Sequence, residues 1–268
     1  MRLIYWRDSV NPRNLFHDEK GACMSRRMVI ASIVNCLILL SIACSAFAQQ
    51  PGQGAANAAP AERRRPGPAP LFFREDWKTV PGLPVEHPVN QAAVGNPNLE
   101  LKLYGVASKD IQENGAPTNV DNPLHVWTGL CEGPCALSFR EKNSYVDLTG
   151  SAKIRWYIKV SGFHQVRPLI KLADGTWLVG DHADGTVSDY HTYEFSINDV
   201  RWIKVDINKV FTRGNLLDSV DLTKVDEIGF ADLMPGSGHG DGGYVDVGWI
   251  EVYGKPVKRD AATSGLRQ

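Results

Sequence analysis

The chain has 268 residues, of which 43% are hydrophobic, and its formal net charge at pH 7 is −1. A chain this close to neutrality lacks the basic face that nucleic acid demands, so nucleic acid is excluded as an expected partner. Its length allows one full domain together with segments outside the folded core.

The first feature in chain order is a predicted signal peptide at residues 24–48, with the sequence MSRRMVIASIVNCLILLSIACSAFA. Two arginines form its positive start, an apolar run follows, and small residues at 46 and 48 match the pattern that a signal peptidase recognises. Cleavage there predicts a mature protein that begins at Gln49, in the periplasm or outside a bacterial cell.

Two alternatives concern this leader. Residues 1–23 are interpreted as upstream sequence translated from a false start, or else as a cytoplasmic tail before an uncleaved anchor at 29–44. That run is shorter than the roughly 20 apolar residues of a spanning helix, so no stable membrane span is expected in the mature form. Lipidation at Cys44 is a further alternative.

Composition divides the rest of the chain. Residues 49–70 are rich in Ala, Gly, Pro and Gln and predict a disordered linker. Residues 71–257 have the size of a single domain with a full hydrophobic core, and residues 258–268 predict a disordered tail.

Cysteine usage agrees with export. Once the leader is removed, only Cys131 and Cys135 remain, on either side of a turn-forming Glu-Gly-Pro. In an oxidising compartment they predict a structural disulfide. Zinc is the alternative, with His125 nearby, but the local sequence lacks a fourth ligand.

Alternation of apolar and polar residues predicts strands along the domain, most clearly at 99–104, 153–160 and 202–207. Only short turns are expected near 109–114, 197–200 and 218–224. About ten short strands predict an all-β fold, an antiparallel β-sandwich or jelly roll. The further predicted strands are 72–77, 136–140, 166–173, 176–180, 190–197, 226–231 and 245–253.

The segments SAKIRWYIKVSG, RWIKVDINKV and DLTKVDEIGFADLMPGSGHGDGGYVDVGWIEVYG together resemble the galactose-binding-like jelly rolls of carbohydrate-binding modules. The chain is also similar to a group of exported bacterial proteins without assigned activity. The resemblance implies that the first strand, in LFFREDWK at 71–78, pairs beside the last. It implies a fold more directly than a function.

Motifs of common enzymes are missing from the sequence: it has no GxSxG elbow, HExxH helix, EF-hand loop or P-loop. No catalytic residue is assigned. His239 and Asp241, at the tip of a glycine-rich run, are candidates only because loops often carry function.

Carboxylates in the last strand raise the question of a metal. Asp246 and Glu251 are five residues apart and face opposite sides of the strand unless Gly248 marks a bulge. The jelly-roll resemblance admits a structural calcium ion held by either one near Glu75 or Asp76. Otherwise they are surface carboxylates, and no other cofactor is expected.

A polar strand face that includes aromatic rings is the candidate binding site. If the strands at 153–160 and 202–207 share a sheet, rings and charged groups together form a platform on which sugar C–H faces stack and hydroxyls form hydrogen bonds. The alternative is that these aromatics are half-buried packing residues. The predicted ligand-binding residues are Arg155, Tyr157, Trp177, Asp181, His182, Tyr190 and Trp202.

The leading hypothesis is an exported, non-catalytic domain that binds a carbohydrate or a glycan-like polymer. The first alternative is a glycoside hydrolase or polysaccharide lyase on the same scaffold, using loop carboxylates and a histidine such as His182 or His239. The second is an envelope domain that binds another protein. The sequence does not predict the oligomeric state.

Overall fold

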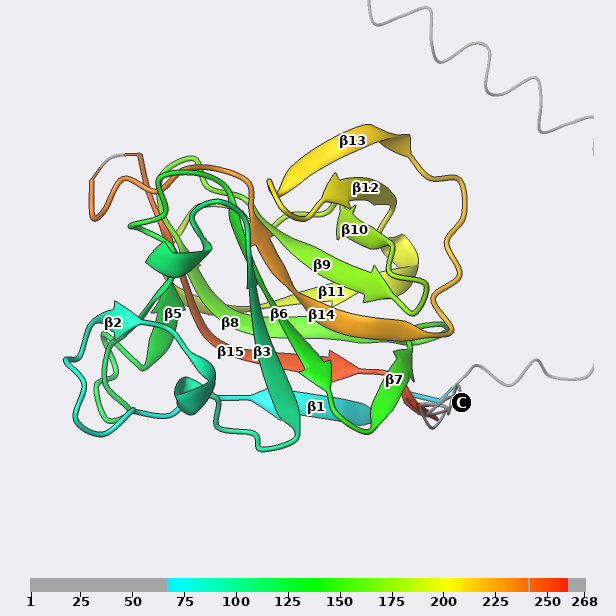
Figure 1. Ribbon diagram of the computed structural model, residues 1–268, viewed down its shortest axis with the longest axis horizontal. Helices are drawn as coiled ribbons and strands as arrows, with labels where there is room; N and C mark the ends of the chain where they lie inside the picture. Colours follow the sequence, from blue (N-terminus) through cyan, green and yellow to red (C-terminus); the bar gives the residue numbers. More distant parts are fainter. Residues whose placement is uncertain (1–66, 241, 260–268) are drawn as a thin grey trace, which may run out of the picture. The chain divides into compact units, whose positions relative to one another are not determined.

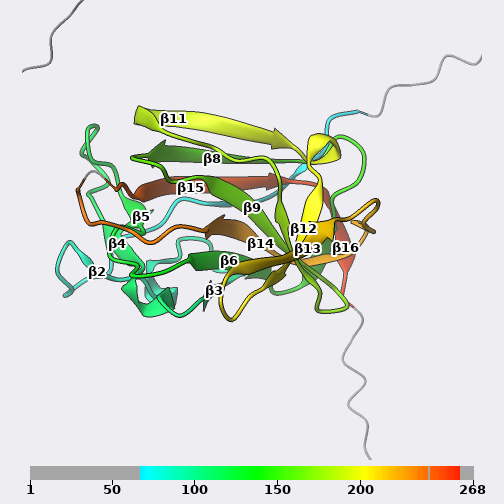
Figure 2. The same cartoon turned by 90° about the horizontal axis from the view of Figure 1, so that it is seen from above.

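The computed structural model describes residues 67–240 and 242–259, which form two antiparallel sheets packed face to face (Figure 1). Figure 2 shows the two layers from above. The all-β antiparallel sandwich expected from the sequence is confirmed. The predicted signal peptide, the segment before it, residues 49–66 of the linker and residues 260–268 of the tail lie outside the described ranges.

The first sheet contains seven strands. They are β1 (Leu71–Glu75), β2 (His87–Pro88), β4 (Gln112–Asn114), β5 (His125–Trp127), β8 (Lys153–Val160), β11 (Val187–Ser196) and β15 (Val245–Tyr253). Their order is β11-β8-β15-β5-β4-β2, and β1 pairs with β15.

The second sheet contains nine strands. They are β3 (Leu99–Tyr104), β6 (Cys135–Glu141), β7 (Ser144–Asp147), β9 (Val166–Leu172), β10 (Trp177–Gly180), β12 (Trp202–Asp206), β13 (Phe211–Leu216), β14 (Val225–Asp232) and β16 (Lys255–Lys258). Their order is β13-β12-β10-β9-β14-β6-β3, with β7 paired to β14 and β16. Three short 3-10 turns complete the elements, at Gln91–Ala93, Ser108–Asp110 and Ile197–Asp199.

The core between the sheets follows from the alternation in β8. Ile154, Trp156, Ile158 and Val160 are fully buried, while the residues between them are half-buried on the outer side. They pack with apolar residues of the second sheet such as Phe230. The predicted buried face of this strand is therefore confirmed.

A second, smaller apolar cluster covers the outer face of the nine-stranded sheet, where it includes Leu169, Val179 and Val205. Both faces of β12 are consequently covered. Trp202, only 3% exposed, belongs to the main core, whereas Val205 belongs to the outer cluster. The prediction that Trp202 lies on a polar, solvent-facing side is wrong for this reason.

β1 lies beside β15, the strand of the VDVGWIEVYG segment, as the resemblance implied, with Leu71 opposite Tyr253. The short β16 that follows belongs to the other sheet. The backbone N–H of Gly254 donates to the carbonyl of Pro70 at 2.9 Å, which extends this pairing by one step. Within residues 67–240 and 242–259, no helix has the length and apolar character needed to cross a membrane.

Candidate functional site

Three aromatic rings on the outer face of the seven-stranded sheet lie against one another in a row. They belong to Tyr190 of β11, Tyr157 of β8 and Trp249 of β15, which are neighbouring strands. The ring centroids of Tyr157 and Tyr190 are 5.1 Å apart with 23° between the planes, and those of Tyr157 and Trp249 are 5.9 Å apart with 11°. This is offset stacking, a favourable arrangement of aromatic pairs. We call these three residues the aromatic ladder.

A bulge in β15 makes the ladder possible. The pairing of β15 with β8 shifts by one residue between Val247 and Trp249, so Gly248 is the extra residue. A Cβ at Gly248 would lie 2.9 Å from Cδ1 of Tyr157, so only glycine lets that ring lie so close to the strand. Because of this shift, Asp246 and Glu251 share the outer face. The sequence allowed this arrangement only if Gly248 marked a bulge, and the bulge is present.

Fixed charges border the ladder on the Trp249 side. Glu251 lies between two guanidinium groups, 2.5 Å from Nη1 of Arg74 and 3.1 Å from Nη1 of Arg155. The Cζ atom of Arg74 also lies 4.5 Å from the ring centroid of Trp249. Hydrogen bonds to Asp76 and Glu251 raise the pKa of Arg74 still further above its usual range. These groups are therefore held in place as charged partners.

A buried carboxylate lies behind the other end of the ladder. Asp246 Oδ1 is 3.4 Å from Nε2 of His125, and burial raises the pKa of Asp246. Burial first, and then the charge of Asp246, also raise the pKa of Tyr190. The Nζ atom of Lys159 lies 5.9 Å from the Tyr190 ring centroid. Tyr190 thus remains protonated, and its hydroxyl oxygen is buried.

A loop between β4 and β5, residues 115–123, borders the same face, and we call it the arch loop. Its ends are tied together because the N–H of Ala116 donates to the carbonyl of Asn122 at 3.1 Å. Near its tip, the N–H of Asp121 donates to Oδ1 of Asn119 at 3.0 Å. Gly115 has a φ of 85°, and a Cβ there would meet the carbonyl oxygen of Pro123 at 2.1 Å. Its own contacts therefore give the loop a defined shape.

Two hollows lie between the arch loop and the ladder, and Tyr157 lines both. The polar hollow has a volume of about 300 Å³ and is lined by Val120, Asp121, Tyr157, Lys159, Ser188, Asp189 and Tyr190. The apolar hollow has a volume of about 240 Å³ and is lined by Asp76, Trp77, Pro117, Pro123, Leu124, Tyr157, Gly248 and Trp249. Each is at or below the lower end of the roughly 300–1,000 Å³ typical of small-ligand sites.

Of the residues predicted to bind ligand, the structure brings three together, namely Arg155, Tyr157 and Tyr190. The predicted platform of Tyr157 and Trp202 is not formed, because β8 and β12 belong to different sheets. The ring of Tyr157 also lies between two others, so its faces are not free to receive a sugar ring. The ladder instead offers ring edges and the walls of the two hollows, while the Tyr190 hydroxyl is buried.

The other predicted residues lie elsewhere. Trp177 is on the outer face of the nine-stranded sheet, where its ring meets that of Tyr104 edge-on at 4.7 Å. Asp181 follows β10 and accepts hydrogen bonds from His182 and from the backbone and side chain of Arg201, each at 2.8 Å. Burial alone would raise the pKa of Asp181, but these bonds outweigh it and lower the pKa to about 2. This group forms a surface ion network.

Sequence reasoning missed Trp249, Arg74 and the arch loop. A signal for Trp249 was present, because it alternates with Glu251 and Tyr253 after Gly248. Once the bulge is accepted, that alternation places all three on the outer face. The arch loop has no periodic pattern, and its position depends on contacts made after folding.

Cys131 and Cys135 are both buried, and the structure holds them as free thiols. A hydrogen bond with Cys131, together with burial, raises the pKa of Cys135, so the two sulfurs are neighbours. The disulfide stays a prediction. His125 faces Asp246 instead of the cysteines, so the zinc alternative has lost its nearby histidine.

The carboxylates named for calcium do not fit a cation site. Glu75 is fully buried, and its oxygens accept hydrogen bonds from the backbone N–H groups of Trp77, Gly95 and Asn96 at 2.8, 2.6 and 2.9 Å. Asp76 is paired with Arg74 at 2.6 Å. Among the described residues, no group of three or more His, Cys, Asp or Glu side chains is arranged to hold a metal ion.

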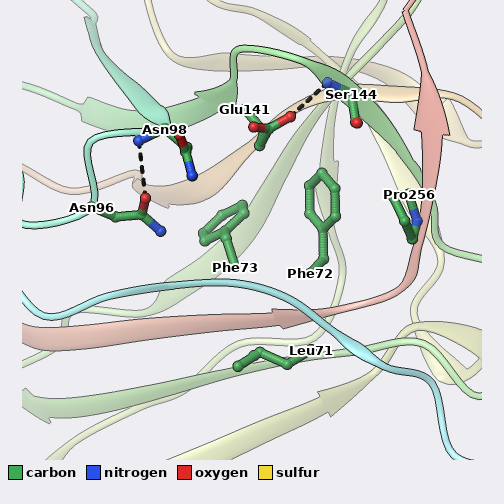
Figure 3. Close-up of a pocket in the computed structure, with 8 residues that line it drawn as sticks. All are labelled: Leu71, Phe72, Phe73, Asn96, Asn98, Glu141, Ser144 and Pro256. Atoms are coloured by element: carbon green, nitrogen blue, oxygen red, sulfur yellow. Dashed lines mark hydrogen bonds between the residues drawn. The ribbon is translucent and has the colours of Figure 1, made fainter.

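A further hollow of about 230 Å³ lies beside β1, away from the ladder (Figure 3). Its polar groups are engaged in local turns: Oε2 of Glu141 accepts from the N–H of Ser144 at 2.5 Å, and Oδ1 of Asn96 accepts from the N–H of Asn98 at 3.0 Å. The side chains of Phe72 and Phe73 lie between these turns and β1 (Figure 3). We find no converging set of free polar groups there.

Comparison with known proteins gives likeness of structure only. No protein-family model and no curated protein matches the chain. A family 11 carbohydrate-binding module from Clostridium thermocellum, solved with a β-1,3-1,4-mixed-linked tetrasaccharide, is 19% identical with a TM-score of 0.40, and the match covers 65% of this chain and 98% of the module. A family 11 module of the cellulase Lic26A-Cel5E from the same organism is 16% identical with a TM-score of 0.40, covering 62% and 93%. A xylan-binding module, CBM15, is 14% identical with a TM-score of 0.33, covering 66% and 99%.

Proposed function

We propose that the outer face of the seven-stranded sheet binds a carbohydrate without chemically changing it, in an exported protein. The observation that supports this proposal is the aromatic ladder, flanked by two hollows beneath a loop of defined shape. Exposed aromatic groups that are held in order, with a few polar groups around them, are typical of binding sites.

The charges around the ladder favour a neutral, hydroxyl-rich ligand. Lys159 offers a donor and Asp121 and Asp189 offer acceptors around one hollow. A hydroxyl group both donates and accepts hydrogen bonds, so it can accept from the ammonium group and donate to the carboxylates. A polyanion would need a surface of one sign instead.

The test is a glycan array probed with the full-length protein, followed by calorimetry with each glycan that binds. Trp249→Ala should lower affinity about thirtyfold, since removing a central aromatic residue costs on the order of 2 kcal/mol. Trp177→Ala is the matched control, because it removes a half-buried indole from the opposite sheet. It should leave binding unchanged.

The enzyme alternative is tested in the same samples by the release of reducing ends. Turnover that is lost in Asp121→Asn or Asp189→Asn would favour a hydrolase that uses the carboxylates of the polar hollow. Absence of any glycan binding, or equal losses in Trp249→Ala and Trp177→Ala, would overturn the proposal and leave the protein-binding alternative.

A further inference from the structure

The two hollows beside the ladder differ in chemistry, and this difference constrains the ligand. They share Tyr157 and the arch loop, so one ligand can occupy both at once. Neither is large by the standard of small-ligand sites. A chain with one unit in each hollow suits this arrangement better than a single bulky group.

The apolar hollow offers fewer side-chain hydrogen-bonding groups than the polar hollow, and those it has beyond the Tyr157 hydroxyl and the Trp249 indole N–H are already engaged. The indole N–H of Trp77 already donates to the carbonyl of Val247 at 2.9 Å. The carboxylate of Asp76 is held by the guanidinium of Arg74. Pro117 and Pro123 have no backbone N–H. The rest of the wall is mainly apolar.

A hydroxyl group placed against Pro117, Pro123 and Leu124 in this hollow would lose its bonds to water and gain few in return. Burying a polar group without a partner costs free energy, whereas burying an apolar group in the same place is favourable. The polar hollow has the opposite character, with Lys159, Asp121, Asp189 and Ser188 around it.

Resting on the proposed function, we infer that the apolar hollow selects a sugar unit carrying an apolar substituent, while the polar hollow takes an ordinary hydroxyl-rich unit. The ligand class is an oligosaccharide of at least two units in which one unit presents a methyl group to the hollow. This is the methyl of a 6-deoxy sugar, or that of an O-acetyl or N-acetyl group whose polar atoms stay outside the hollow. The walls formed by Pro117, Leu124 and Trp249 receive that substituent.

The experiment uses the full-length protein and an array containing pairs of glycans that differ in one substituent. Suitable pairs are chito- and cello-oligosaccharides of equal length, fucosyl and galactosyl glycans, and acetylated polymers before and after mild alkali. Within each bound pair, the substituted member should bind about fourfold more tightly for each buried methyl group, which corresponds to about 0.8 kcal/mol.

Two matched variants locate the selection, since both change one exposed apolar residue of the arch loop. Pro117→Ser polarises the apolar hollow and should bring the affinity ratio of each pair close to one. Val120→Ser changes the polar hollow and should keep the ratio.

The outcomes separate this inference from the proposed function. If no glycan binds, the proposed function fails, and the inference with it. If glycans bind with equal affinity within pairs, if the unsubstituted members are preferred, or if Pro117→Ser weakens both members equally, the inference is overturned while carbohydrate binding stands.

Discussion

Single residues contribute unequally to the stability of this sandwich, and Glu75 is the clearest example. Its buried carboxylate accepts three backbone N–H groups, two of them from the turn at residues 95–96. In Glu75→Gln the new amide would direct a donor toward one of these donors. We expect a loss on the order of 2 kcal/mol in the free energy of unfolding.

Urea denaturation of the full-length protein measures this loss. Asp76→Asn is the neighbouring control, because it alters an exposed ion pair with Arg74 and should cost less than about 1 kcal/mol. Equal stability of Glu75→Gln and wild type would show that the three hydrogen bonds contribute little. If Glu75 instead held calcium, EDTA would lower the wild-type melting temperature, and we expect no such shift.

Asp181 gives a prediction in pH. Its pKa is lowered from 3.8 to about 2 in the folded state, so the unfolded state binds more protons between these values. The contribution of Asp181 to stability is therefore complete above pH 4 and is lost as the pH falls toward 2. Asp181→Asn should lower the melting temperature at neutral pH, with the difference from wild type shrinking below pH 4. A constant difference across this range would contradict the assignment.

Alternation predicted single residues well where only one face of a strand is covered. In β8 it placed Arg155 and Tyr157 correctly on the outer side. It failed at Trp202 because β12 buries a residue on each face, with Trp202 in the main core and Val205 in the outer cluster, although Lys204 on the side of Trp202 is exposed. Sequence periodicity cannot show whether one or both faces of a strand are buried. In β12 the second buried face depends on the outer apolar cluster of the nine-stranded sheet, which forms only in the folded protein.

At the scale of elements, the bulge in β15 sets the geometry of the site. Gly248→Ala places a methyl group 2.9 Å from the Tyr157 ring, so the ring must move. We expect a destabilisation of about 1–3 kcal/mol, as for other overpacked sites, and weaker glycan binding. Thermal unfolding and calorimetry measure the two effects.

Gly185→Ala is the control for this substitution, since nothing lies within 4 Å of a Cβ at that position. It should change stability by less than about 0.5 kcal/mol. A Gly248→Ala variant with unchanged stability and unchanged binding would show that the ladder tolerates a shift of Tyr157.

All ten predicted strands are present, and 99–104, 153–160 and 245–253 have the predicted bounds. The sequence did not reveal six others, namely β2, β4, β5, β7, β13 and β16. Most of these are short, and β13 is exposed along nearly all of its length, so it has no buried face to produce an alternation. Such strands form because a neighbour offers hydrogen bonds, which a local pattern does not record.

For the whole molecule, the redox state of the cysteines follows from the compartment. In exported protein, Cys131 and Cys135 are predicted to form a disulfide and to resist alkylation until reduced. Closing so short a loop contributes about 2 kcal/mol on the chain-entropy model, so the double Cys→Ser variant should fold with a lower melting temperature. Mass spectrometry after alkylation of native protein measures this. Two free thiols in exported protein would contradict the prediction.

Export itself is predicted from residues 24–48, which lie outside the described ranges. N-terminal sequencing of periplasmic or secreted material should give Gln49 as the first residue. Retention of residues 1–23, or a lipid on Cys44, would contradict this. Both measurements are independent of ligand binding.

The all-β sandwich was predictable because strand alternation and turn residues agree along the domain. The candidate site was predictable only in part, because Tyr157 and Tyr190 come together through the order of strands in the sheet, which local sequence does not determine. Trp202 was assigned to this site from strand alternation on the assumption that its strand shares a sheet with 153–160, and Trp177 was assigned to its rim; the topology places both in the other sheet.

The pairing of β1 with β15 affects how the protein folds. Leu71 lies opposite Tyr253, so this contact joins residues near opposite ends of the domain. Contacts of such wide sequence separation slow folding. A circular permutant that links the two ends of the domain and opens the chain at the exposed Asp174-Gly175 turn would bring β15 and β1 close in sequence, separated by β16 and the linker. That permutant should keep the same sandwich and reach it faster than the natural chain order does.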